Sequence, residues 1–317
     1  MKKLIETIRN IWNIEDLRNR LLVTLGILAI YRFGSFVVIP GVDPMQLAAL
    51  QDQTSDGLLG LLNMFTGGAF SQASIFALGI MPYISASIVI QLLGMAVPYF
   101  QKLQKEGESG RRKINNITRY LTILITGGQA PGYIANLKNT LPADAFLLDP
   151  GVFWFSSIII LVTGTMFVMW LGEKITDRGV GNGISLLIMI GIIASFPQSL
   201  MQEFGLALES ASGGLVLFLV EMLLLLFVIL VTILLVQGTR RIPVQYAKRV
   251  IGNKQYGGVR QFIPLKVNAA GVMPIIFAQA IMFVPITLVG FSDNDQLEGI
   301  SRVLSDFQGF WYNLLFF

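Results

Sequence analysis

The chain has 317 residues, of which 54% are hydrophobic and only 13% charged, and its formal net charge is +4. This composition, with a mean hydropathy of +0.67, excludes an ordinary water-soluble domain and is typical of a protein that lies in lipid. Cysteine and histidine are both absent, which excludes disulfides, thiolate or imidazole metal sites and histidine-dependent catalysis.

Long apolar runs predict an all-α polytopic membrane protein, because a span needs roughly 20 mostly apolar residues. Seven runs approach this length: Leu21–Ile39, Ser74–Val97, Ile117–Tyr133, Val152–Leu171, Gly183–Leu200, Gly214–Val236 and Ala269–Gly290. Gly309–Phe317 begin an eighth run and stop, so we expect the sequence to be part of a longer chain. The charged N-terminal segment leads into the first run, which we expect to act as its own targeting signal.

The short segment Gly57–Phe65 is apolar but cannot span, and Thr66, Gly67 and Gly68 end it. An interrupted helix at membrane depth is tolerated only inside protein or facing an aqueous cavity. Two interpretations are equally open: a short helix folded back from the non-cytoplasmic side, or an interfacial helix lying flat on the membrane.

Basic residues gather in alternate loops. The N-terminus and the second-to-third, fourth-to-fifth and sixth-to-seventh loops hold most of the 23 lysines and arginines, whereas the intervening loops are acidic. Short basic loops stay in the cytoplasm. The pattern therefore predicts a cytoplasmic N-terminus, one basic face and one acidic face.

The sixth-to-seventh loop, residues 237–266, is the longest basic segment and has no acidic residue. Its basic residues are Arg240, Arg241, Lys248, Arg249, Lys254, Arg260 and Lys266. A long basic loop held to the bilayer at both ends indicates a docking surface, although charge alone favours a plain topology signal. Arg111, Arg112 and Lys113 are expected on the same face.

Two isoleucine pairs have helical spacing, Ile80 with Ile84 and Ile184 with Ile188, so each pair shares a helix face. Lipid-facing or core packing is the ordinary meaning of this spacing. The glycine-rich run 178–183 lacks the Lys-Ser/Thr of a P-loop and predicts a tight turn before the fifth span.

Polar residues inside the spans are few. Ser85 permits close helix approach, while Gln91 and Asn268 suit either hydrogen bonds between helices or, slightly favoured, the membrane interface.

Arg32, toward the far end of the first span, is expected either to snorkel to the interface or to pair internally. Glu221 lies near the start of the sixth span. An ion-coupled transporter usually carries an acidic or histidine relay near the midplane, which this sequence does not show.

Several segments together resemble the SecY family of bacterial protein-translocation channels. They are GSFVVIPGVD (34–43), NMFTGGAFSQASIFALGIMPYISASIVIQLL (63–93), KEGESGRRKINNITRY (105–120), LVTGTMFVMWLGEKITDRGVGNGISLLI (161–188), RRIPVQYAKR (240–249) and PLKVNAAGVMPIIFA (264–278). The resemblance implies a clamshell of transmembrane helices with two inverted, pseudo-symmetric halves. Residues 1–200 would form the first half. Residues 201–317 would begin the second, with spans six and seven, the basic loop 237–266 and the start of span eight.

The resemblance also implies roles for particular residues. The segment 57–70 would be the plug, with Gly57, Leu58, Leu59, Leu61, Leu62, Asn63, Met64, Phe65, Gly67 and Gly68. The constriction ring would include Ile80, Ile84, Ile184, Ile188 and Ile276. Ser85, Gln91 and Asn268 would line the lateral gate. The match at 240–249 favours docking over a topology signal for Arg240, Arg241, Lys248, Arg249, Lys254 and Arg260, with Arg111 and Arg112 on the same face.

The implied function is the central subunit of a channel that moves unfolded secretory polypeptides across the bacterial cytoplasmic membrane and releases hydrophobic segments sideways into lipid. Implied partners are SecE-like and SecG-like small membrane subunits, a SecA-type motor ATPase, the ribosome, signal peptides, nascent chains and lipid. We expect no enzymatic activity, no metal and no cofactor. A secondary transporter of small solutes is the alternative, and a membrane enzyme is disfavoured because histidine, cysteine and paired carboxylates are missing.

Overall fold

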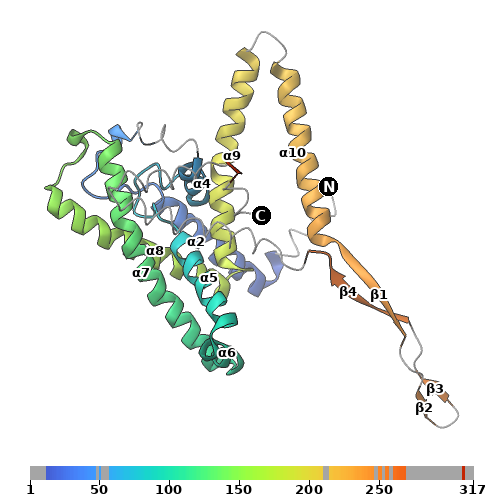
Figure 1. Ribbon diagram of the computed structural model, residues 1–317. Helices are drawn as coiled ribbons and strands as arrows, with labels where there is room; N and C mark the ends of the chain where they lie inside the picture. The colour runs from blue at the N-terminus through green and yellow to red at the C-terminus, as the bar shows by residue number, and fades with distance from the viewer. Residues whose placement is uncertain are drawn as a thin grey trace. The chain divides into compact units, whose positions relative to one another are not determined.

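The computed structural model describes residues 12–47, 50, 57–209, 214–245, 249–251, 254–256, 260–268 and 309–310 (Figure 1). The chain divides into two compact units, Met1–Pro197 with Ala280–Phe317 and Gln198–Gln279, and each is described by itself. The predicted seventh span, Lys248 and Ile276 lie outside the described residues.

The first unit is helical. Its elements are α2 (Glu15–Gly34), the 3-10 turn η1 (Pro44–Gln46), α4 (Gly57–Thr66), α5 (Met81–Ala96), α6 (Pro98–Lys105), α7 (Glu108–Thr140), η2 (Ala143–Ala145), α8 (Pro150–Arg178) and the first half of α9 (Gly183–Glu209). The rest of α9 belongs to the second unit, together with α10 (Gly214–Gln237), β1 (Thr239–Gln245), β2 (Arg249–Ile251), β3 (Lys254–Tyr256) and β4 (Arg260–Lys266).

By length and composition, three of the described helices are able to cross a membrane: α8, α9 and α10. The pair α5 and α6 counts as a fourth if it is one span, bent by 99° at Val97. The predicted first and third spans do not qualify, although α2 has 20 residues and α7 has 33. The reason is composition: α2 contains three arginines, and α7 combines a charged first third with polar and small residues further on.

The structure corrects the bounds of two predicted spans. The first does not reach Ile39, because α2 ends at Gly34 and the chain continues to a β-bridge between Val38 and Ser74. The second begins at Met81 rather than Ser74, because residues 67–80 form turns. Proline at position 82 suits a first helical turn, where its missing N–H is no loss.

Two apolar clusters form the core of the first unit. One joins the loop around Ile39 and Val42 to the ends of α7 and α8, with Ile134 and Phe153 fully buried. The other joins α2, α5, α8 and α9 around Leu171. Small and polar residues on α7 pack against α5 and α8, and the buried threonine hydroxyls donate to carbonyls four residues earlier. These bonds satisfy the hydroxyls without requiring a partner on another helix.

The second unit contains β-structure that the composition of the loop did not predict. β1 and β4 pair antiparallel over seven residues each, from Thr239 opposite Lys266 to Gln245 opposite Arg260. The ribbon ends in the shorter β2–β3 pair (Figure 1). The many charges of the loop obscure the alternation of branched apolar residues that favours strands.

Candidate functional site

The short helix α4 ends in a well-defined glycine cap. The Gly67 N–H donates to the Met64 carbonyl at 3.2 Å, and the Gly68 N–H donates to the Asn63 carbonyl at 2.9 Å. Gly67 has a φ of +67°, the left-handed conformation that this cap requires and that glycine adopts without strain. The last carbonyls of a helix have no partner within it, so those of Thr66 and Gly67 accept hydrogen bonds from outside α4.

Both carbonyls meet side chains of α2. Arg32 Nη1 donates to the Gly67 carbonyl at 2.6 Å, and the Tyr31 hydroxyl lies 3.5 Å from the Thr66 carbonyl. The guanidinium of Arg32 also lies over the Phe36 ring, 4.7 Å from its centroid. Arg32 therefore pairs internally, one of the two outcomes that its position in the sequence predicts. These contacts join residues 35 positions apart in the sequence.

The same end of α4 lies against α9. A Cβ atom added to Gly191 would be 2.7 Å from the Phe65 carbonyl, and one added to Gly67 would be 2.8 Å from the Gly191 Cα. Such distances leave no room for a side chain at either position. The end of α4 thus sits between α2 and α9, a contact that sequence reasoning missed at Gly191. The sequence indicated this contact only through the glycine itself, because small residues in a span permit helices to approach closely.

The structure brings four of the five predicted ring isoleucines into one apolar cluster. Ile80 is buried there, and Ile84, Ile184 and Ile188 are half-buried against it. The Ile84 N–H donates to the Ile80 carbonyl at 3.1 Å, so the expected helical spacing is present. Gly79, next to Ile80, is so close to Thr66 that an added Cβ would be 2.9 Å from the threonine methyl group. The cap of α4 therefore touches the segment that begins this cluster.

The predicted gate residues have different surroundings. Ser85 is buried in α5, and Gln91 is exposed on the same helix, with Nε2 lying 3.5 Å from Ser87 Oγ. This contact runs along one helix rather than between two. Asn268 belongs to the second unit, so its gate role stays a prediction.

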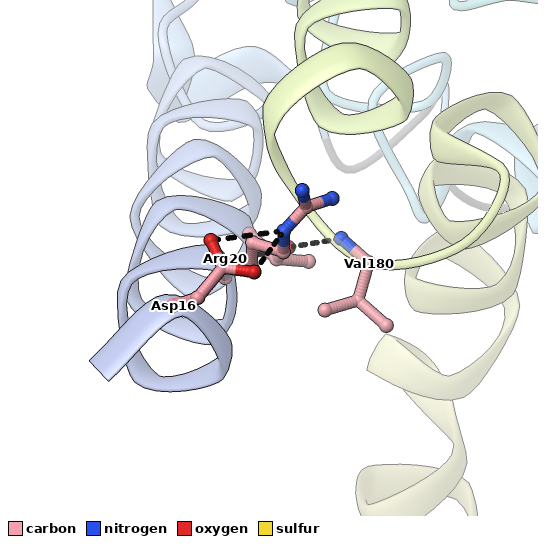
Figure 2. Close-up of polar contacts among 4 residues, drawn as sticks. Asp16, Arg20 and Val180 are labelled. Carbon is pink, nitrogen blue, oxygen red and sulfur yellow. Dashed lines mark hydrogen bonds and ion pairs between the residues drawn. The ribbon is translucent and has the colours of Figure 1, made fainter. Parts of the chain in front are cut away.

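The turn between α8 and α9 is held to α2, and the predicted tight turn is confirmed (Figure 2). The Val180 N–H donates to Thr24 Oγ1 at 3.1 Å, and the Thr24 hydroxyl donates to the Arg20 carbonyl at 2.8 Å. Gly181 has a φ of +75°, and the Asn182 side chain caps the first turn of α9. The N-terminal end of α2 and the start of α9 are thereby kept together.

The basic ribbon has two different faces, because opposite residues in an antiparallel pair share a face and neighbours alternate. One face carries Arg240 beside exposed Ile242, Ile263 and Leu265. The other carries Arg241 and Lys266, both exposed, beside Phe262. Arg249, Lys254 and Arg260 lie in the strands β2, β3 and β4.

The second basic site begins α7. Arg111 and Arg112 are exposed in its first turns, and Arg112 forms an ion pair with Glu108 at 2.9 Å. Further along, Arg119 makes two bonds to Glu173 of α8, at 2.6 and 3.3 Å, which sequence reasoning missed because the partners are 54 residues apart. Among the residues that the structure describes, no group of three or more acidic residues is placed to hold a metal ion.

Comparison with known proteins identifies relatives over most of the chain. A family model described as SecY matches residues 74–317. The protein translocase subunit SecY of Escherichia coli K12 is 47% identical over 280 residues, covering 87% of this chain and 62% of that protein. SecY of Haemophilus influenzae is 47% identical over 293 residues, covering 91% of this chain and 65% of that protein. The chain therefore spans less than two thirds of the length of these relatives.

Solved structures share the fold. A structure described as a protein conducting channel has a TM-score of 0.54 at 18% identity, covering 86% of this chain and 58% of that one. The idle yeast Ssh1 complex bound to the 80S ribosome has a TM-score of 0.55 at 14% identity, covering 87% of this chain and 60% of that one. At these identities the likeness concerns the arrangement of helices alone.

Proposed function

This chain belongs to the SecY family, and we propose from that premise that it forms the N-terminal part of the central subunit of a protein-conducting channel. One observation carries the proposal: the cap of α4 is seated between α2 and α9 and touches the start of the isoleucine cluster. This is the arrangement that a plug resting beside a constriction requires. An interfacial helix lying flat on the membrane has no need of such contacts.

The mechanism follows from the chemistry of the cluster. Branched apolar side chains at a narrow waist resist wetting, so ions leak poorly through it. They also bind no particular sequence, so polypeptides of many sequences slide past. With α4 displaced, a polar segment crosses, whereas a segment that partitions favourably into lipid leaves sideways. From the family resemblance, Ser85 and Gln91 are proposed to line that exit, and the same role is proposed independently for Asn268.

The basic ribbon and, separately, the first turns of α7 are each proposed as a docking site for a ribosome or a SecA-type motor. Exposed Arg240, Arg241 and Arg111 suit RNA phosphates or acidic protein surfaces. Two solved structures that share the fold are described with ribosomes: Sec61 in a canine ribosome-channel complex and the yeast Ssh1 complex bound to the 80S ribosome. From the positive-inside rule, we propose that the basic segments and the N-terminus lie in the cytoplasm of a bacterium. SecE-like and SecG-like subunits complete the assembly.

The alternative of a small-solute transporter receives no support from the relatives, which carry the name of a protein translocase subunit. The cluster around Ile80 is also apolar, whereas a solute site near the midplane requires polar or charged groups.

Ion conductance across planar bilayers tests the proposal. The full-length protein is reconstituted with its SecE-like partner, with and without residues 57–70. We expect the intact channel to be tight and the deletion to leak ions. Equal conductance of the two forms would refute the plug assignment.

A further inference from the structure

Arg32 is the one arginine of α2 that has no carboxylate within ion-pair distance in the described part of the chain, since Arg18 pairs with Glu15 and Arg20 with Asp16. It lies within the predicted first span, where an arginine is costly unless it is satisfied internally. Its described partners are the Gly67 carbonyl and the Phe36 ring. Arg32 is therefore satisfied by the residue that directly follows α4 and by an aromatic ring.

We propose that Arg32 is a positioning residue that latches the plug helix α4 in its seat, with Gly191 as the second half of the latch. The inference rests on the proposed function, because it deepens the role assigned to α4. It concerns how the plug is held, which the plug assignment itself leaves open.

The chemistry of the helix end suits an arginine. The last carbonyls of a helix carry partial negative charge, so a cation at the C-terminal end is favourable. Arg32 donates to the Gly67 carbonyl while the carbon of its guanidinium lies over the Phe36 ring. A planar guanidinium performs both tasks at once, whereas the point charge of a lysine does not offer a planar face for stacking.

The glycine contact supplies the second restraint. The backbone of Gly191 approaches the Phe65 carbonyl and Gly67 so closely that only hydrogen fits at these Cα atoms. The cap is thus restrained by α2 on one side and by α9 on the other. Release of α4 requires breaking the bond to Arg32 and separating the cap from Gly191.

A buried thiol reports whether the cap is seated. These 317 residues contain no cysteine, so once any cysteine in the rest of the full-length protein and in its partners is replaced, Thr66→Cys is the single thiol. Thr66 is only 2% exposed. The full-length protein with its partner subunits is labelled with a membrane-impermeant maleimide, and the labelling rate of the introduced thiol is measured by the mass shift of this chain. With Arg32→Gln we expect the rate to rise about ten- to a hundredfold, the range for losing a hydrogen bond to a charged group. Arg20→Gln, on the same helix but exposed beside Asp16, is the matched control and leaves the rate unchanged.

Two further variants separate a latch from general misfolding. Arg32→Lys keeps a cationic donor and is expected to label more slowly than Arg32→Gln. Gly191→Ala adds one methyl group against the Phe65 carbonyl, keeps every charge, and is expected to raise the labelling rate. Labelling of Arg32→Gln at the parent rate would overturn the latch, and labelling of Gly191→Ala at the parent rate would overturn the part assigned to Gly191.

The two proposals fail in different ways. If deletion of residues 57–70 opens a leak while Arg32→Gln labels at the parent rate, the plug stands and the latch is wrong. If the deletion leaves conductance unchanged, the plug assignment fails whatever the labelling rates are.

Discussion

Replacing Thr24 by valine tests how the turn between α8 and α9 is held to α2. The Thr24 hydroxyl accepts the Val180 N–H at 3.1 Å, and Thr24 is 7% exposed. Valine keeps the shape of threonine and removes the hydroxyl, so the Val180 N–H loses its partner. The bond is only part-buried, so its loss costs about 0.5–1.5 kcal/mol, the net contribution of a typical hydrogen bond. Because about 1.4 kcal/mol corresponds to a factor of ten, the opening equilibrium at Val180 should rise roughly 2- to 10-fold.

Amide hydrogen exchange of the peptide that contains Val180 measures this change directly. Thr163→Val is the matched control, because Thr163 donates to the Ile159 carbonyl within α8 but its side chain is exposed. We expect faster exchange near Val180 in Thr24→Val and no change in the control. Equal exchange of Val180 in Thr24→Val and in the parent protein would show that the bond does not hold the turn.

Three further predictions concern the ring, the docking face and the packing of the turn. Ile84→Ser should raise ion conductance across planar bilayers, because a hydroxyl at a narrow waist favours wetting. Val89→Ser is the control and should leave the conductance unchanged, because Val89 is exposed on the same helix. Equal conductance of the two variants would contradict the ring assignment. Replacing Arg240 and Arg241 by glutamine should make the affinity for ribosomes less dependent on salt. In a sedimentation assay, the slope of log affinity against log salt should decrease in magnitude by about 1 for each RNA phosphate that an arginine no longer neutralises. An unchanged slope would count against docking. Gly183→Ala should lower the melting temperature of the detergent-solubilised protein, because the added Cβ meets the Gly172 carbonyl. Gly205→Ala is the control and should leave the melting temperature unchanged, because there is open space at its Cβ. If Gly183→Ala melted at the temperature of the parent protein, the structure would be able to accommodate the added methyl group without cost.

The family and the membrane class were readable from the residues alone. Composition, apolar runs and alternating basic loops are local or additive properties, so they do not depend on how helices pack. The segments quoted for the resemblance include the motif around Ile80 and the turn at 178–183, and the SecY family match confirms the assignment. The spacing of Ile80 and Ile84 likewise follows from helical periodicity.

Other features required the tertiary structure. The run 237–266 has the charge of a loop, yet β1 and β4 pair along it, because strands are stabilised by partners that lie distant in sequence. The start of α5 at Met81 depends on the glycines and turns before it, which hydropathy does not register. A window of apolar residues therefore marks where a span lies but not where its helix begins.

Arg32 shows most clearly where sequence reasoning ends. The sequence by itself determined that a cation lies within the first apolar run and that it either snorkels or pairs internally. Only the fold decided that its partner is the carbonyl of Gly67, with Gly191 on the other side of the same cap. A backbone carbonyl is present at every residue and leaves no mark in the sequence, so which one meets a given side chain is decided by packing alone.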